Sequence, residues 1–470
     1  MSSIKKNFLY NSLYQIMVMF IPLITTPYIS RTLGASGVGT YSYAYSVANY
    51  YVLFIMLGLN NYGNRTIAKI RDDKNELRKT FWSIYSMQLM LGIIINIIYF
   101  IYCFNISADM KVSLAVGLYV ISGCFDINWL FFGLEKFKLT VVRNTAIKIL
   151  TTASIFIFVK DQNDVLIYCL IMTLGMLISQ FALWPFILKN IKFYKPDIKE
   201  ITVHIKPNLF LFLTVIAVSL FKVMDKVMLG MMSGSSQVGY YESAEKIIQV
   251  PTALITSLGT VMLPRMTNMV NKNENQNKRM IYLSIQFAMF ISTSLCFGIM
   301  GVSKEFVPLF YGNGFEVCIY LYIILLPSCV FLAFANVIRT QYLLPHQMDK
   351  PYVISAFLGA GVNIIINMLL IPYYGCIGAA IGTFFAEMSV FIFQCFSVKK
   401  YLPIKKYLLK SMYFIFSGIA MFLCLYNLNF TGMTYLTVLI IKIIIGILVY
   451  FLLLGIQMMF QKFILKKSIF

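Results

Sequence analysis

Apolar segments about 20 residues long recur along nearly the whole chain, and each is long enough to cross a bilayer as a helix. Of the 470 residues, 59% are hydrophobic and only 12% are charged. A soluble core does not need so much apolar surface. We therefore expect an all-α polytopic membrane protein without a large extramembrane domain, which excludes a soluble enzyme and a receptor with a folded ectodomain.

Hydropathy along the sequence predicts fourteen transmembrane helices. They cover residues 9–30, 40–60, 81–103, 113–133, 142–160, 165–188, 209–230, 243–264, 281–303, 318–338, 353–372, 376–397, 409–428 and 434–460. Spans placed this closely leave only turns and short loops between them.

Positive charge is divided unevenly between the predicted connections. With a cytoplasmic N-terminus and alternating spans, the inner segments hold thirty Lys and Arg residues, and the outer segments hold four: Arg31, Lys111, Lys160 and Lys304. Because Lys and Arg are enriched in cytoplasmic loops, this pattern predicts that both termini are cytoplasmic. It also attributes the net charge of +21 to topology rather than to nucleic-acid binding.

Sites for catalysis or metal binding are not evident in the composition. The nine cysteines are scattered without a CxxC pair, and the only histidines, His204 and His346, fall in predicted connections. The sequence also contains no Walker motif. We therefore expect a protein that is not an enzyme and has no cofactor.

A short motif occurs twice in the sequence. Leu33-Gly34 is followed by Val38-Gly39-Thr40-Tyr41, and Leu229-Gly230 is followed by Val238-Gly239-Tyr240-Tyr241. Each copy lies at the first outer turn of a predicted six-span unit, and six is even, so the units share one orientation. We predict two parallel-repeat six-helix lobes, an N-lobe at 1–200 and a C-lobe at 201–400, with helices 13 and 14 at 401–470.

Four blocks of sequence carry a family resemblance. They are Ser30-Arg31-Thr32-Leu33-Gly34 through Gly39-Thr40-Tyr41; Asp126-Ile127-Asn128-Trp129 with residues 132–138; residues 225–230 with 238–241 and 244–247; and Asn367 with residues 371–380. Together they resemble the polysaccharide-biosynthesis flippases of the Wzx type, in the superfamily of multidrug, oligosaccharidyl-lipid and polysaccharide exporters.

The resemblance implies a function and a location. Such a flippase moves undecaprenyl-diphosphate-linked oligosaccharide repeat units from the inner to the outer leaflet of the bacterial cytoplasmic (inner) membrane by alternating access, for capsule or O-antigen-type polysaccharide assembly. Its implied partners are this lipid-linked oligosaccharide, membrane lipid, and a polysaccharide polymerase with its chain-length machinery, with no role for nucleic acid.

Two other function classes stay open from the sequence alone. A small-molecule exporter of drugs or cations, from the same superfamily, would favour acidic groups in its cleft, whereas the charges within the predicted spans are mainly basic. A membrane polysaccharide polymerase or glycosyltransferase would need a sizeable outer loop with catalytic residues, and the predicted outer loops are short.

Cationic residues within or beside the spans are the candidates for diphosphate binding, since a charge at a helix centre costs about 2.5–3.5 kcal/mol on insertion scales and calls for a reason. They are Arg31, Lys148, Lys222, Lys226 and Lys246. Lys222, Asp225 and Lys226 share one helical face at i, i+3 and i+4 spacing. The alternatives are internal ion pairs, such as Glu242 with Lys246, and lysines that snorkel to the head groups.

Three acidic residues and one further lysine complete the set of candidates. Asp225, Glu245 and Glu387 are candidates for coupling transport to a proton or cation gradient, because ionisable groups within spans are commonly functional. Lys442, in the last predicted span, is the candidate for contact with a lipid phosphate beside a groove for the lipid tail, or for snorkelling to the interface.

Overall fold

The computed structural model describes the backbone of residues 2–269 and 274–467, and these residues form helices and turns without a strand. Side chains are described for residues 20–457, apart from 214, 217, 218, 221, 222, 264 and 270–273. The first part of the chain contains α1 (Ser2–Met56), α2 (Leu59–Ile70), α3 (Lys74–Asn105), α4 (Met110–Cys124), α5 (Asn128–Gly133), α6 (Phe137–Phe158), α7 (Val165–Phe181), α8 (Trp184–Asn190), α9 (Ile198–Thr202) and α10 (Ile205–Ser233).

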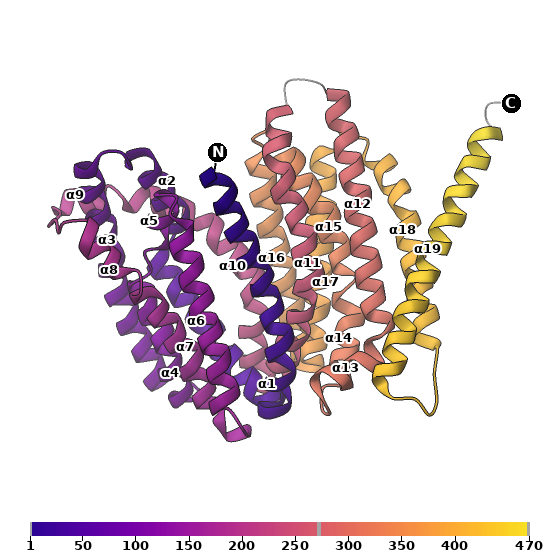
Figure 1. Cartoon of the computed structure of the whole chain (residues 1–470), viewed down its shortest axis with the longest axis horizontal. Helices are drawn as coiled ribbons and strands as arrows, with labels where there is room; N and C mark the ends of the chain where they lie inside the picture. The colour runs from indigo at the N-terminus through magenta and orange to yellow at the C-terminus, as the bar shows by residue number, and fades with distance from the viewer. Residues whose placement is uncertain (1, 270–273, 468–470) are drawn as a thin grey trace. The chain divides into compact units, whose positions relative to one another are not determined.

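The second part of the chain is also a helical bundle (Figure 1). It contains α11 (Ser235–Met269), α12 (Glu274–Gly301), α13 (Ser303–Tyr311), α14 (Val317–Leu325), α15 (Ser328–Ile338), α16 (Asp349–Tyr374), α17 (Cys376–Val398), α18 (Ile404–Asn427) and α19 (Tyr435–Lys467). A π-helical turn, Arg339–Leu343, follows α15.

Within the described residues, 12 helical stretches are long and apolar enough to cross a membrane. The first of them, Phe20–Ile70, covers the end of the first predicted span and the whole of the second, on either side of a non-helical Gly34. The seventh predicted span, 209–230, lies within α10. The all-helical architecture is confirmed, while the count of fourteen spans and the cytoplasmic placement of the termini stay predictions.

The chain divides into two compact units, Met1–Gly230 and Met231–Phe470. By contacts the division therefore falls in the last turn of α10, whereas the predicted N-lobe ended at residue 200 and the predicted C-lobe at residue 400. The assignment of separate six-helix lobes and an added helical pair stays a prediction.

Helix α10 contacts α1 and α2 at a few points within the first unit. At its start, His204 Nδ1 and the Tyr62 hydroxyl of α2 share a hydrogen bond of 2.6 Å. Near its end, Gly230 lies so close to Tyr43 of α1 that a Cβ would be 2.0 Å from the ring. These contacts are consistent with the assignment of most of α10 to the first unit.

The repeated motif is present in the backbone with a different register from the one predicted. Gly230 lies inside α10, and the glycine that breaks the helix is Gly234, with a φ of 88°, matching Gly34 with a φ of 66°. Only glycine adopts such positive φ values readily. When Gly34 is aligned with Gly234, the same shift in sequence also aligns Val38-Gly39 with Val238-Gly239. The linker between the glycine and this motif then has the same length in both copies.

Equivalent positions in the two copies also make equivalent contacts inside their own units. Tyr41 packs edge-on against Tyr168 of α7, with ring centroids 4.9 Å apart. Tyr241 shares a 2.8 Å hydrogen bond with Thr383 of α17. Helix α7 lies within the sixth predicted span and α17 contains the twelfth, so each tyrosine contacts the last predicted span of its own half; the repeat of six spans stays a prediction.

Candidate functional site

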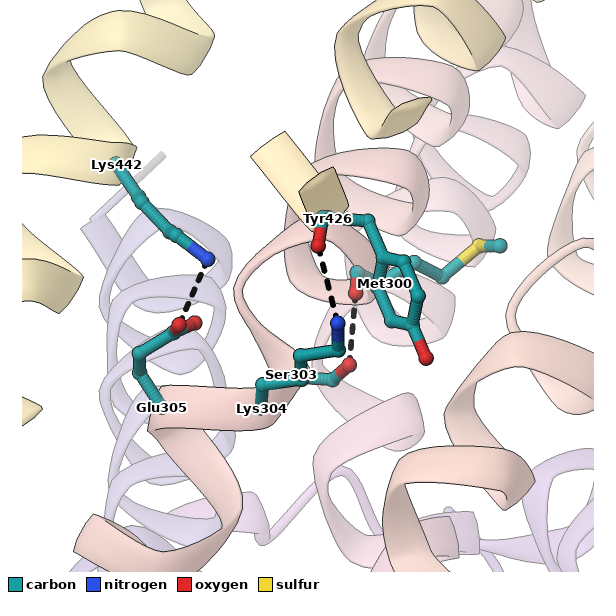
Figure 2. Close-up of polar contacts among 6 residues, drawn as sticks. All are labelled: Met300, Ser303, Lys304, Glu305, Tyr426 and Lys442. Carbon is teal, nitrogen blue, oxygen red and sulfur yellow. Dashed lines mark hydrogen bonds and ion pairs between the residues drawn. The ribbon is translucent and has the colours of Figure 1, made fainter. Parts of the chain in front are cut away.

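A buried ion pair joins α13 to α19 in the second unit. Lys442 Nζ donates a hydrogen bond to Glu305 Oε1 across 2.7 Å, as Figure 2 shows. The Lys442 side chain is 0% exposed and that of Glu305 is 11% exposed. Removing a charge from solvent has a large desolvation cost. A buried ammonium and a buried carboxylate offset that cost only by pairing with each other.

The residues before Glu305 fix the start of α13. Lys304 Nζ donates to the backbone oxygen of Tyr426 across 3.1 Å and lies 3.8 Å from the centre of its ring. Tyr426 is in the last turn of α18, where carbonyl groups lack partners and favour a cation. The Ser303 hydroxyl donates to Met300 O of α12 at 2.8 Å (Figure 2). Short α13 is thus tied to α12, α18 and α19.

An apolar groove of about 530 Å³ lies beside this ion pair. It is lined by side chains of α12, α13, α18 and α19, among them Leu439 and Ile443, which flank Lys442 in sequence, and Phe306, which follows Glu305. The groove is therefore a hydrocarbon-like surface with one buried pair of charges next to its wall.

Lys442 does not snorkel to the surface, and its predicted contact with a lipid phosphate beside a tail groove stays a prediction. Its ammonium neither reaches the surface nor faces lipid, because the side chain is fully buried and paired with Glu305. A lysine in the upper third of the last predicted span had suggested snorkelling or contact with a lipid phosphate. The carboxylate that holds it instead is 137 residues away in the sequence.

Two of the three predicted candidates on α10 have described side chains. Asp225 is buried, and it lies close enough to Tyr50 of α1 for its charge to act on that hydroxyl. Lys226, the next residue, is partly exposed. The side chain of Lys222 lies outside the described residues. A role of this cluster in diphosphate binding stays a prediction.

Lys246 on α11 forms the ion pair that the helical spacing suggested. Its Nζ lies 3.6 Å from Glu242 Oε1 one turn earlier, and the two side chains are 22% and 18% exposed. Glu245 is also partly exposed. The pair leaves part of each side chain accessible, so binding of a phosphate by Lys246 stays a prediction.

The remaining candidates lie in different environments. Arg31 is exposed in α1, three residues before the Gly34 break, and Lys148 is partly exposed in α6. Glu387 is buried in α17. Their predicted roles in diphosphate binding and ion coupling are untested by these positions.

A polar network around Arg143 was not predicted from the sequence. The guanidinium donates from Nη2 to Asn128 Oδ1 at 2.9 Å and from Nη1 to Ser179 O at 2.9 Å. Asn128 in turn donates from Nδ2 to Asp126 Oδ1 at 2.6 Å. Arg143 had been counted only among the basic residues of a loop, yet it is 9% exposed and ties α6 to α7 and to the start of α5.

The same network lies at a break between α4 and α5. Gln88 Nε2 donates to the backbone oxygens of Gly123 and Asp126, at 2.8 and 2.9 Å, and its Oε1 accepts from Trp129 Nε1. These side chains satisfy carbonyl groups that a continuous helix would have paired. A signal was present in the sequence, because Asp-x-Asn favours local side chain to backbone bonding over helix.

A metal centre is not formed by the described residues, since no three His, Cys, Asp or Glu side chains among them gather closely enough to hold an ion.

Comparison with solved structures identifies proteins with a similar fold. The chain resembles the lipid II flippase MurJ in an inward closed conformation, with a TM-score of 0.77 and 18% identity. The match covers 97% of this chain and 100% of that one. The chain also resembles a multidrug resistance MATE family transporter of the MOP superfamily, with a TM-score of 0.60, 13% identity, and coverage of 83% of this chain and 99% of that one. At these identities the likeness shows the fold alone.

Sequence relatives are more informative about the family. A protein of Escherichia coli (strain K12) that is named for O-antigen transport is 21% identical over 83% of this chain and 95% of its own length. A protein of Haloferax volcanii that is named for a flippase of low-salt glycan biosynthesis is 29% identical over 34% of each chain.

The apolar helices and these membrane-transporter relatives confirm the expectation of a multi-pass membrane protein. The family model described as polysaccharide biosynthesis protein matches residues 4–270, more than half of the chain. The resemblance seen in the sequence is thereby confirmed, and the chain belongs to the polysaccharide biosynthesis protein family.

Proposed function

We propose that this protein is a flippase that moves undecaprenyl-diphosphate-linked oligosaccharide repeat units from the inner to the outer leaflet of the bacterial cytoplasmic membrane. Membership of the polysaccharide biosynthesis family supports the substrate class. The relatives named for O-antigen transport and for a glycan flippase support transport rather than synthesis.

Such a substrate has three chemically different parts. The sugars and the diphosphate need a polar path, since crossing roughly 30 Å of hydrocarbon unshielded is prohibitive, whereas the polyprenyl tail needs an apolar one. A protein suited to this task combines charged groups inside the membrane with an apolar groove.

The observation that carries the proposal is the groove of about 530 Å³ lined by α12, α13, α18 and α19. Its apolar lining matches a polyprenyl chain, and the lining includes Phe290, Leu295 and Ile447. We assign the tail of the substrate to this groove.

Cationic side chains would hold the diphosphate. In this proposal Arg31, Lys148, Lys222, Lys226 and Lys246 supply the positive charge, since charge-assisted hydrogen bonds to phosphate are about twice as strong as neutral ones. Alternating access would carry the head group across, with Asp225, Glu245 and Glu387 as the candidate groups for coupling to an ion gradient.

The groove offers a direct test of the proposal. Gly298 lines it, and a Cβ there would approach no nearer than 3.7 Å, to Met421 Cε, so Gly298→Leu fits the helix while filling the groove. The added side chain would then overpack the groove when the substrate tail enters, at a cost of about 1–3 kcal/mol. At substrate concentrations below saturation, transport of lipid-linked oligosaccharide in proteoliposomes should therefore fall roughly tenfold.

Gly455→Leu is the matched control, because it adds the same side chain to α19 where a Cβ would meet nothing within 4 Å. It should transport at the wild-type rate. Equal rates for the wild type and Gly298→Leu would exclude the groove as the path of the tail.

A further inference from the structure

A second pocket, of about 590 Å³, lies at one end of the first unit. It is formed by the turn between α2 and α3, the first turn of α3, the loop after α5 and the end of α8. In Figure 1 the labels α2, α3, α5 and α8 lie toward the same end of that unit. Three segments that are far apart in the sequence therefore share one concave surface.

The pocket is strongly basic. Five cationic side chains and a single acidic one line it: Arg71, Lys74, Arg78, Lys136, Lys192 and Asp72. Arg71 is already paired, since its Nη1 lies 2.6 Å from Glu135 Oε1. Among the described residues no carboxylate forms an ion pair with the other four cations. The surplus positive charge calls for an anionic ligand.

Two of these cations lie over aromatic rings. Lys136 Nζ lies 4.2 Å from the centre of the Phe186 ring, and the Arg78 guanidinium lies 5.6 Å from that of Tyr194. Arg78 Nε is buried and has no hydrogen-bond partner within the described part of the chain. Arginine donates readily to phosphate oxygens, so this unsatisfied donor favours a phosphate.

We expect the pocket to lie near lipid head groups, because it is formed at the ends of candidate membrane spans. Its residues adjoin the ends of five candidate spans, including Phe20–Ile70 and Met110–Gly133. Next to it, the segment around α8 and α9 exposes Leu188, Phe193 and Ile198, and Trp82 Nε1 donates to Lys192 O at 3.0 Å. Exposed apolar residues and aromatic anchors are typical of the membrane interface.

We propose that this pocket binds the phosphate of an anionic lipid, held by Arg78, Lys136 and Lys192 with Lys74 at the rim. The phosphate is the shared feature of two sources, an anionic phospholipid and an undecaprenyl diphosphate carrier. The site is separate from the groove in the second unit, and it does not depend on the proposed transport function.

The experiment must separate a built site from the general attraction of basic loops to anionic membranes. The pocket variant is Arg78→Gln/Lys136→Gln/Lys192→Gln. The control is Lys69→Gln/Lys138→Gln/Lys195→Gln, which removes the same charge at exposed positions in the same three segments, outside the pocket lining. A charge-retaining variant, Arg78→Lys/Lys136→Arg/Lys192→Arg, together with thermal unfolding, shows whether the fold is intact.

Retention of lipid by the purified full-length protein is measured by native mass spectrometry. The probes are phosphatidylglycerol, undecaprenyl diphosphate, and a neutral galactolipid without phosphate, with inorganic diphosphate as a tail-free competitor. A basic residue near an anionic surface contributes a factor of about five in affinity, so the pocket variant should lose roughly 100-fold. The charge-retaining variant should keep the binding.

Preferential retention of either phosphate lipid, lost in the pocket variant and kept in the control, supports the site, and the better-retained lipid identifies its source. Release by inorganic diphosphate would add that the phosphate is the part recognised. Equal losses in the pocket and control variants would overturn the proposal, as would equal retention of the galactolipid.

Discussion

Lys442 of α19 and Glu305 of α13 form an ion pair of 2.7 Å, and both side chains are buried although they are 137 residues apart in the sequence. The pair connects α19, the last helix, to α13 within the second unit. Because α19 forms one wall of the apolar groove, the same contact also helps to set the shape of that groove.

Breaking this pair on one side is expected to destabilise the protein strongly. Glu305→Gln leaves a buried ammonium without its counter-charge, and removal of one partner of a buried pair typically costs about 3–5 kcal/mol. We expect a lower thermal midpoint of unfolding for Glu305→Gln and for Lys442→Met in detergent.

The double variant Glu305→Leu/Lys442→Met is the informative control, because it removes both charges together. It should unfold at a higher temperature than either single variant, since apolar replacements of a buried pair are often neutral. Additive losses would mean that the two residues do not act on each other.

Arg143 is expected to be structural, and its guanidinium geometry is expected to matter more than its charge. Arg143→Lys keeps the charge but cannot reach Asn128 and Ser179 together, so it should lose about 1.5–3 kcal/mol of unfolding free energy for each hydrogen bond that is not replaced. Lys148→Gln removes a charge from the same helix and should change stability less. The reverse order, measured by thermal unfolding, would refute this assignment.

The contact of His204 with Tyr62 predicts a pH dependence of stability. Burial lowers the pKa of His204, so the folded state favours the neutral imidazole. As pH falls below about 6.5, the unfolded state binds the proton first, and stability falls with it. The thermal midpoint of the wild type should drop relative to that of His204→Asn between about pH 7.5 and 5.5. Parallel pH profiles of the two proteins would contradict the prediction.

Two glycines in the α16–α17 hairpin should respond oppositely to alanine. A Cβ on Gly378 would lie 2.6 Å from the backbone of Leu370, which cannot move aside as a side chain can, whereas one on Gly361 would meet nothing within 4 Å. Gly378→Ala should therefore cost about 1–3 kcal/mol, and Gly361→Ala should stabilise α16 by up to about 1 kcal/mol. Unfolding midpoints that shift in the same direction would argue against this packing.

Sequence patterns predicted the helices well because each span records its own apolar length. The helical stretches follow the predicted spans closely, and Gly34 marks the break inside α1 as the turn motif suggested. The register of the repeat was wrong by four residues. Leu229-Gly230 matched Leu33-Gly34 in letters, but only the backbone shows that Gly234 has the positive φ.

Side-chain partners across the fold were beyond the reach of the sequence. The pairing of Lys442 with Glu305 joins helices that are distant in the chain, and the network of Arg143 joins the successive helices α5, α6 and α7. Local spacing found the partner of Lys246, because Glu242 lies one turn away on the same helix. Contacts within one helix follow from periodicity, whereas contacts between helices depend on how the bundle packs.

Translocation of a fluorescent undecaprenyl-diphosphate-linked oligosaccharide in proteoliposomes tests the central claim most directly. A flippase should give faster transfer between leaflets than protein-free vesicles, with a marked loss of that rate in Lys222→Ala/Lys226→Ala. A rate equal to that of empty vesicles, with transport of a cationic dye by the same preparation, would contradict it and favour a small-molecule exporter.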